Sequence, residues 1–205
     1  HRVARPARRS VDLGRALTLL ARNRLLAILS VAILLAEIFG FASQTLLPTF
    51  ARDVFDVGAA GLGLMTAVRS AGGALGLLAL SRIGAEGRGG LVFVCGAGAF
   101  GLALLLFALS PFYALALVML GISGMCASVM DTLGQTLIQR NADERERGSA
   151  MGIWVFSVGF GPVGHLTLGA LASEFGAPPT QAGSGIMLML VAGLMSLHAP
   201  LRRAR

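Results

Sequence analysis

The sequence predicts an all-α membrane protein that crosses the bilayer with six helices. Of its 205 residues, 55% are hydrophobic and only 13% are charged, which is too little charge to cover the surface of a soluble domain. The apolar residues also form blocks long enough to cross a bilayer, which takes about 20 helical residues. We expect transmembrane helices at about 25–47, 59–81, 91–110, 112–138, 149–173 and 183–199, with an amphipathic, arginine-rich linker at 1–24 and a basic tail at 200–205.

Local signals justify these elements in chain order. VDLGRALTLLARNRLLA has leucines at helical spacing interrupted by arginines, which is typical of a helix lying at the membrane interface. Pro48 is expected to end the first span, RIGAEGRGG to form a turn between spans 2 and 3, and Ser110-Pro111 to separate spans 3 and 4. QRNADERERGS is the most charged loop and joins spans 4 and 5, and EFGAPPTQAG turns the chain into span 6.

The basic residues predict how the helices are oriented. All 17 are arginines, and fifteen lie before span 1, between spans 2 and 3, between spans 4 and 5, or after span 6. The opposite side of this topology holds only Arg52, while Arg69 lies inside span 2. Because cytoplasmic loops are enriched in basic residues, we expect both termini in the cytoplasm. The net charge of +7 then reflects topology, with membrane lipids as partners and no nucleic acid.

Glycines mark two spans as sites of close helix packing. Gly72 and Gly76 form a small-xxx-small pair in span 2, and Gly161, Pro162 and Gly164 cluster in span 5. Small residues let helix backbones approach closely in lipid, and proline bends a helix. We expect ordinary close packing in span 2 and a flexing or closely crossing helix in span 5.

Three charged residues, Glu37, Arg69 and Asp131, lie inside the predicted spans. A charge at the bilayer centre costs about 2.5–3.5 kcal/mol on insertion scales, so such side chains normally face protein, water or a partner. A rise of about 1.5 Å per residue puts Glu37 and Arg69 near the midplane on consecutive helices, which makes an ion pair between them geometrically feasible. Asp131 lies closer to the cytoplasmic end.

Each carboxylate also belongs to a polar stripe, while spans 3 and 6 carry no acid or arginine. Two interpretations stay open. Glu37 and Asp131 form a proton-coupling or cation-binding pair that Arg69 tunes, or a static Glu37–Arg69 bridge fixes the packing while Asp131 is hydrated. The candidate cavity-lining residues at helical spacing from the two carboxylates are Ser30, Gln44, Ser128 and Gln135.

Three segments resemble those of a known family. They are GGALGLLALSRIGAEGRGG (72–90), QTLIQRNADERERGSAMG (135–152) and FGPVGHLTLGALASEFG (160–176). Together they resemble the C-terminal six-helix half of a major facilitator superfamily transporter, closest to the bacterial branch that includes enterobactin exporters. Two positions depart from the pattern, namely Ser81-Arg82 in place of Asp-Arg and Asn141-Ala142 in place of Val-Pro.

The resemblance implies a secondary active transporter of the bacterial inner membrane. We expect proton-coupled efflux, by antiport, of a small organic molecule of the drug or siderophore type, with the first and fourth helices of the half lining the substrate path. The family has twelve spans and this chain has six, and it begins at His1, so we expect a fragment or a processed chain that works with a missing N-terminal half or a second copy.

Two alternatives stay open beside a transporter. A non-transporting scaffold or remnant is one, because six helices supply half of a transporter's cavity. A rhomboid-like intramembrane serine protease is the other, suggested by GISG at 121–124 with His198, but Ser123 and His198 are expected at different depths. We therefore expect no enzyme activity. No cofactor or metal is expected either, since Cys95 and Cys126 lack metal-ligand spacing.

Overall fold

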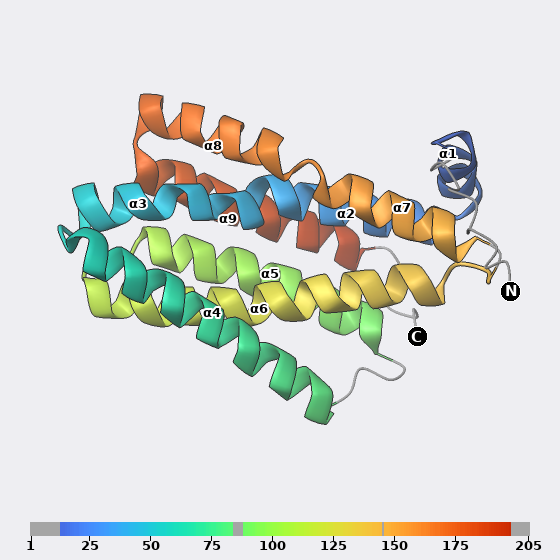
Figure 1. The fold of residues 1–205 in the computed structure, drawn as a ribbon, viewed down its shortest axis with the longest axis horizontal. Coiled ribbons are helices and arrows are strands. Elements are labelled where there is room, and N and C mark those ends of the chain that lie inside the picture. The colour runs from blue at the N-terminus through green and yellow to red at the C-terminus, as the bar shows by residue number, and fades with distance from the viewer. Residues whose placement is uncertain (1–12, 84–87, 145, 198–205) are drawn as a thin grey trace, which may run out of the picture.

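The computed structural model describes residues 13–83, 88–144 and 146–197, and most of them lie in long helices that run side by side (Figure 1). The predicted all-helical membrane fold is confirmed. The predicted basic tail at 200–205, His198 and the first half of the linker at 1–24 lie outside the described residues. The helices are α1 (Leu13–Arg22), α2 (Arg24–Phe39), α3 (Leu47–Thr49), α4 (Gly58–Ile83), α5 (Gly89–Ala108), α6 (Tyr113–Arg140), α7 (Arg147–Val158), α8 (Gly161–Phe175) and α9 (Ala177–Ser196).

Within the described residues, five stretches are long and apolar enough to cross a membrane by length and composition, namely Arg24–Val54, Gly58–Arg82, Gly89–Ala108, Tyr113–Arg140 and Arg147–Phe175. Helix α9 has 20 residues but is not among them. Its first turns contain two prolines, a threonine and a glutamine, and these lower the hydropathy of its N-terminal half. The chain is therefore a multi-pass membrane protein with five to six helices of membrane-spanning length.

The expectation that Pro48 ends the first helix is wrong. The chain stays helical from α2 through a 3-10 segment η1 (Phe41–Leu46), α3 and a π-helical segment η2 (Phe50–Val54). Pro48 lies in the first turn of α3, where a missing N–H costs little because the first amides of a helix have no intrahelical acceptor. The change from 3-10 to π geometry absorbs the proline within one continuous rod.

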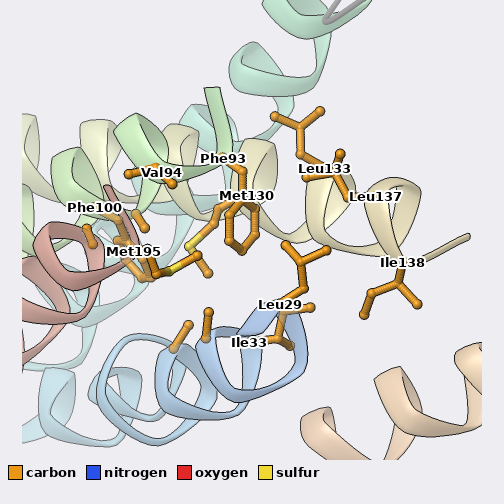
Figure 2. Close-up of a cluster of buried hydrophobic side chains, with 14 of the residues drawn as sticks. Leu29, Ile33, Phe93, Val94, Phe100, Met130, Leu133, Leu137, Ile138 and Met195 are labelled. Carbon is orange, nitrogen blue, oxygen red and sulfur yellow. The ribbon is translucent and has the colours of Figure 1, made fainter. Parts of the chain in front are cut away.

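The core joins helices that are distant in sequence. Helix α5 packs between α6 and α9, while α4 packs mainly against α6. Figure 2 shows Leu29 and Ile33 of α2 meeting Phe93 of α5 and Met130 of α6 in one apolar cluster. A second cluster around Phe50 and Phe107 forms the core near α3.

Glycines set the two closest helix crossings. A Cβ on Gly72 of α4 would overlap the backbone of Gly121 on α6, and one on Gly76 would lie 2.5 Å from the Met125 carbonyl oxygen. Helices α5 and α9 meet in the same way, since a Cβ on Gly101 would lie 2.7 Å from the Gly185 carbonyl oxygen. The sequence pattern marked the first crossing, but nothing singled out the second.

Most of the described arginines lie at one end of the bundle, which we call the α1 end. Figure 1 shows α1, the ends of α4 and α6 and the starts of α5 and α7 at this end. These helix ends carry Arg22, Arg24, Arg82, Arg88, Arg140 and Arg147. Arg52 lies in η2 at the opposite end, where it pairs with Asp53.

Candidate functional site

A pocket of about 420 Å³ lies between η1, α4 and α6. Its polar lining consists of Gln44, Thr66, Arg69, Ser70 and Ser128, and its apolar wall includes Phe41, Ala74, Leu77 and Ala127. The pocket therefore contains many of the polar side chains of the first, second and fourth membrane-spanning segments, which are Arg24–Val54, α4 and α6.

Helix periodicity explains why these side chains converge. Thr66, Ser70 and Gly73 follow one another at steps of four and three residues, so they lie on one face of α4. That face meets α6 closely, because a Cβ on Gly73 would lie 2.6 Å from the Ser128 hydroxyl oxygen. The absence of a side chain at Gly73 leaves the room in which Ser128 reaches the pocket.

Arg69 lies in this pocket with only 7% of its surface exposed. Its guanidinium carbon sits 5.8 Å from the centre of the Phe100 ring, in cation–π contact. Among the residues the structure describes, no carboxylate lies within 4.0 Å of its guanidinium. The ion pair considered between Glu37 and Arg69 is therefore absent, and with it the interpretation of these two residues as a static structural bridge.

Glu37 points to a different neighbourhood. A Cβ on Gly161, the first residue of α8, would lie 3.7 Å from the Glu37 Oε2 atom. Asp131 of α6 is close enough to act on Glu37 electrostatically. Both carboxylates are half-buried, Glu37 on α2 beside the start of α8 and Asp131 on α6, and we call them together the carboxylate pair.

The contact between α2 and α6 accounts for this pair. A Cβ on Gly134 would lie 3.2 Å from the Ile33 Cδ1 atom, which marks where the two helices touch. The helices run in opposite directions (Figure 1). A residue one turn after Ile33 on α2 therefore lies at the same height in the bundle as a residue one turn before Gly134 on α6. Glu37 and Asp131 occupy those positions.

The four predicted cavity-lining residues divide into two groups. Gln44 and Ser128 line the pocket. Ser30 is buried and donates its hydroxyl to the Leu26 carbonyl at 2.7 Å, so it packs against its own helix. Gln135 is half-buried and lies outside the lining. A seven-residue period placed Ser30 on the face of Glu37 but could not show that a neighbouring helix covers it.

The predicted cluster of Gly161, Pro162 and Gly164 lies at the break between α7 and α8, which together form the fifth membrane-spanning segment. Helix α7 ends at Val158, and α8 begins at Gly161 with Pro162 in its first turn. A Cβ on Gly164 would lie 2.7 Å from both the Ala42 Cβ and the Ile38 Cα atoms, so α8 lies directly on the first rod. The interruption thus stands beside the Glu37 carboxylate.

Two aromatic residues of the site were not predicted from the sequence. Phe100 of α5 covers Arg69, and Phe41 of η1 lines the pocket and meets Phe100 edge to face at a ring separation of 5.6 Å. Phe41 lies one helical step from Gln44, and that spacing was the available signal. Phe100 carries no such signal, because it comes from a span without acids or arginines.

The protease alternative finds no support in the described residues. Ser123 is completely buried and donates its hydroxyl to the Leu120 carbonyl at 2.8 Å. A nucleophilic serine needs a base within hydrogen-bond reach and an open approach for the substrate. Ser123 is a packing residue of α6.

A multi-pass helical bundle with a polar pocket and two intramembrane carboxylates is typical of a membrane transport protein. The model of the Major Facilitator Superfamily matches residues 15–205, and the chain belongs to this family. It is accordingly of a transporter family and not an enzyme.

Curated relatives of the chain include exporters. It is 30% identical over 167 residues to the enterobactin exporter EntS of Escherichia coli O1:K1 / APEC, and 29% identical over 166 residues to that of Shigella boydii serotype 18. The matches cover 80% of this chain but 40% of each relative. The chain thus spans well under two thirds of the length of these relatives.

Proposed function

We propose that this chain forms one six-helix half of a proton-coupled efflux transporter for small organic molecules. The observation that carries the proposal is the position of the carboxylate pair beside the pocket. Asp131 lies three residues from Ser128 on α6, which is about 4.5 Å along the helix axis. A change at the pair therefore reaches the pocket wall through one rigid helix.

Charge repulsion supplies the coupling. Two half-buried carboxylates that act on one another repel when both are ionised, and a proton bound at the pair removes the repulsion. Binding and release of this proton would draw together and separate α2 and α6. Glu37 also lies beside the first residue of α8. Proton binding and release at the pair would therefore also move the break between α7 and α8.

The pocket is one side of a larger cavity in this proposal. The six helices supply its wall from η1, α4 and α6, and the relatives are more than twice as long as the matched region. Secondary transporters bind substrate at the interface of two structural repeats. A second six-helix half, or a second copy of this chain, would close the pocket. The α1 end, with its arginines, would face the cytoplasm.

Transport in vesicles tests the proposal. The intact gene product would be reconstituted with an imposed pH gradient, and the flux of labelled enterobactin, the compound named for the relatives, would be measured within a panel of small organic compounds. Replacing Glu37→Gln or Asp131→Asn should abolish the gradient-driven component while leaving exchange of substrate across the membrane. Glu174→Gln, an exposed position near the end of α8, is the matched control.

Two results would overturn the proposal. Proton-driven flux in Glu37→Gln equal to that of the unaltered protein removes the coupling role of this carboxylate. Absence of flux for every compound in the unaltered protein favours a non-transporting scaffold instead.

A further inference from the structure

We propose that the pocket between η1, α4 and α6 binds a small organic anion with an aromatic or otherwise apolar body, and that Arg69 pairs with its anionic group. This inference names the substrate class of the transport site and so rests on the function proposed above. It is carried by a buried guanidinium that faces a pocket without a counter-charge.

Arg69 has no polar partner among the described residues. A guanidinium has five N–H donors, and none of those of Arg69 forms a hydrogen bond or ion pair with the part of the chain that the structure describes. With 7% of its surface exposed, the residue bears the cost of a desolvated charge. Unpaired buried charges are rare because their solvation is lost, so Arg69 needs an anion from outside the described residues, and we assign this role to the ligand.

The surroundings of Arg69 hold it ready for such a ligand. The Phe100 ring lies 5.8 Å from the guanidinium carbon and stabilises the charge of the group without using its N–H donors. Planar guanidinium groups bind carboxylate, sulfonate and phosphate groups through paired N–H donors. The pocket is the open space beside this prepared group.

Further donors lie at the same pocket. Ser70, Ser128 and Gln44 line it, and the side chains of these three form no hydrogen bond with another described residue. Thr66 differs, because its hydroxyl already donates to the Gly63 carbonyl at 2.8 Å. Two hydroxyls and an amide therefore remain available to the polar part of a ligand.

The rest of the lining fits an apolar body. Phe41, Ala74, Leu77 and Ala127 form this wall, and a volume of about 420 Å³ falls in the range of pockets for small organic molecules. Neither Glu37 nor Asp131 belongs to the lining, so its one full charge is positive. A cation would be repelled by Arg69, and a neutral ligand would leave the guanidinium unpaired.

Binding of three matched probes tests the inference. We would measure, by isothermal titration calorimetry on the purified intact gene product, the affinities of 2-naphthalenesulfonate, neutral 2-naphthalenesulfonamide and cationic 2-naphthyltrimethylammonium. These share the aromatic body and differ in charge. The sulfonate should bind at least tenfold more tightly than the sulfonamide, and the ammonium compound most weakly, since only the sulfonate pairs with a buried cation.

Variants assign the preference to Arg69. Arg69→Gln should reduce the sulfonate affinity at least tenfold and change the sulfonamide affinity little, whereas Arg69→Lys should keep part of the preference. Arg52→Gln is the matched control, because Arg52 is exposed in η2 and paired with Asp53. Monodispersity on size-exclusion chromatography reports folding, and the order of the three probes in the unaltered protein tests the inference even if a variant fails to fold.

The inference is overturned if the unaltered protein binds none of the probes, prefers the ammonium compound, or binds sulfonate and sulfonamide equally. It is also overturned if folded Arg69→Gln retains the sulfonate affinity. These failures differ from failure of the proposed function. Arg69-dependent sulfonate binding without gradient-driven flux would reject the transport mechanism alone, and gradient-driven flux without an anion preference would reject the anion site alone.

Discussion

The crossing of α4 and α6 is the part of the structure on which the pocket depends most directly, and Gly72→Ala perturbs it at one point. A Cβ added at Gly72 would overlap the Gly121 carbonyl oxygen and lie 2.8 Å from its carbonyl carbon and 3.0 Å from its Cα. All three atoms belong to the backbone, so no side-chain rotation relieves the overlap. The helices must separate instead.

The size of the effect follows from these distances. Ordinary van der Waals contact begins near 3.4 Å, so the two backbones must move apart by roughly 0.6 Å or more. Overpacking of this kind costs about 1–3 kcal/mol, and the higher helix propensity of alanine returns about 1 kcal/mol. Because the overlap involves only backbone atoms, we use the upper cost of about 3 kcal/mol, and after the gain in helix propensity we expect Gly72→Ala to destabilise the protein by about 2 kcal/mol. Gly63→Ala on the same helix has no atom within 4 Å of its new Cβ and should be neutral or slightly stabilising.

Thermal unfolding with a thiol-reactive coumarin maleimide measures the difference in a Cys95→Ala background, since Cys95 is exposed and would react in the folded protein, whereas Cys126 is buried and becomes reactive on unfolding. Gly72→Ala should melt clearly below both the unaltered protein and Gly63→Ala. It should also weaken ligand binding in the pocket, because Gly73, the next residue along α4, meets the Ser128 hydroxyl that lines the pocket. A Gly72→Ala protein that melts at or above Gly63→Ala would refute this packing of α4 on α6.

Three further substitutions test other parts of the structure by the same melting assay. Gly164→Ala should destabilise the protein by about 1–3 kcal/mol and reduce transport, because its Cβ would push α8 away from α2 and η1. Gly169→Ala, with open space around it, should do neither, and equal melting temperatures of the two variants would contradict the contact. Gln181→Leu should raise stability by about 1–3 kcal/mol, because both amide atoms of Gln181 are buried without a partner, and a lower melting temperature would show that the amide is satisfied. Asn23→Ala should cost about 1 kcal/mol, because the Asn23 side chain caps α2 and also donates to the Asn141 carbonyl at 3.2 Å; unchanged melting would argue against the cap.

The fold could be predicted from the sequence because membrane-spanning helices leave a strong signal. Every backbone group in lipid must be paired within its own segment, so long apolar blocks have little choice but to be helical. Where polar residues enter, the signal weakens. Helix α9 begins with prolines, Thr180 and Gln181, and it forms through packing on α5 at Gly101 and Gly185. That contact joins residues 84 positions apart, and a period within one helix carries no information about it.

The candidate site was predicted in its parts but not in its assembly. Helical periodicity correctly grouped polar residues on faces of single helices, and depth along the axis follows from a constant rise per residue. The partner of a face depends on which helix lies against it. Arg69 and Glu37 were placed at one depth, but Arg69 turns toward Phe100 of α5, and Glu37 turns toward Asp131 and the start of α8.

This separation changes what the two charged groups can do. An ion pair between Glu37 and Arg69 would make proton uptake and anion binding compete for one guanidinium. In the structure Arg69 is free of Glu37, so the proposed proton site and the proposed anion site are separate charges linked through α6, where Asp131 and Ser128 lie one turn apart. The proposals together therefore require that Glu37→Gln alter the pH dependence of transport while leaving sulfonate affinity nearly unchanged. Arg69→Gln should lower sulfonate affinity while leaving the pH dependence of transport nearly unchanged. A parallel loss of both properties in either variant would show that the two residues exchange partners during transport, as a direct ion pair would.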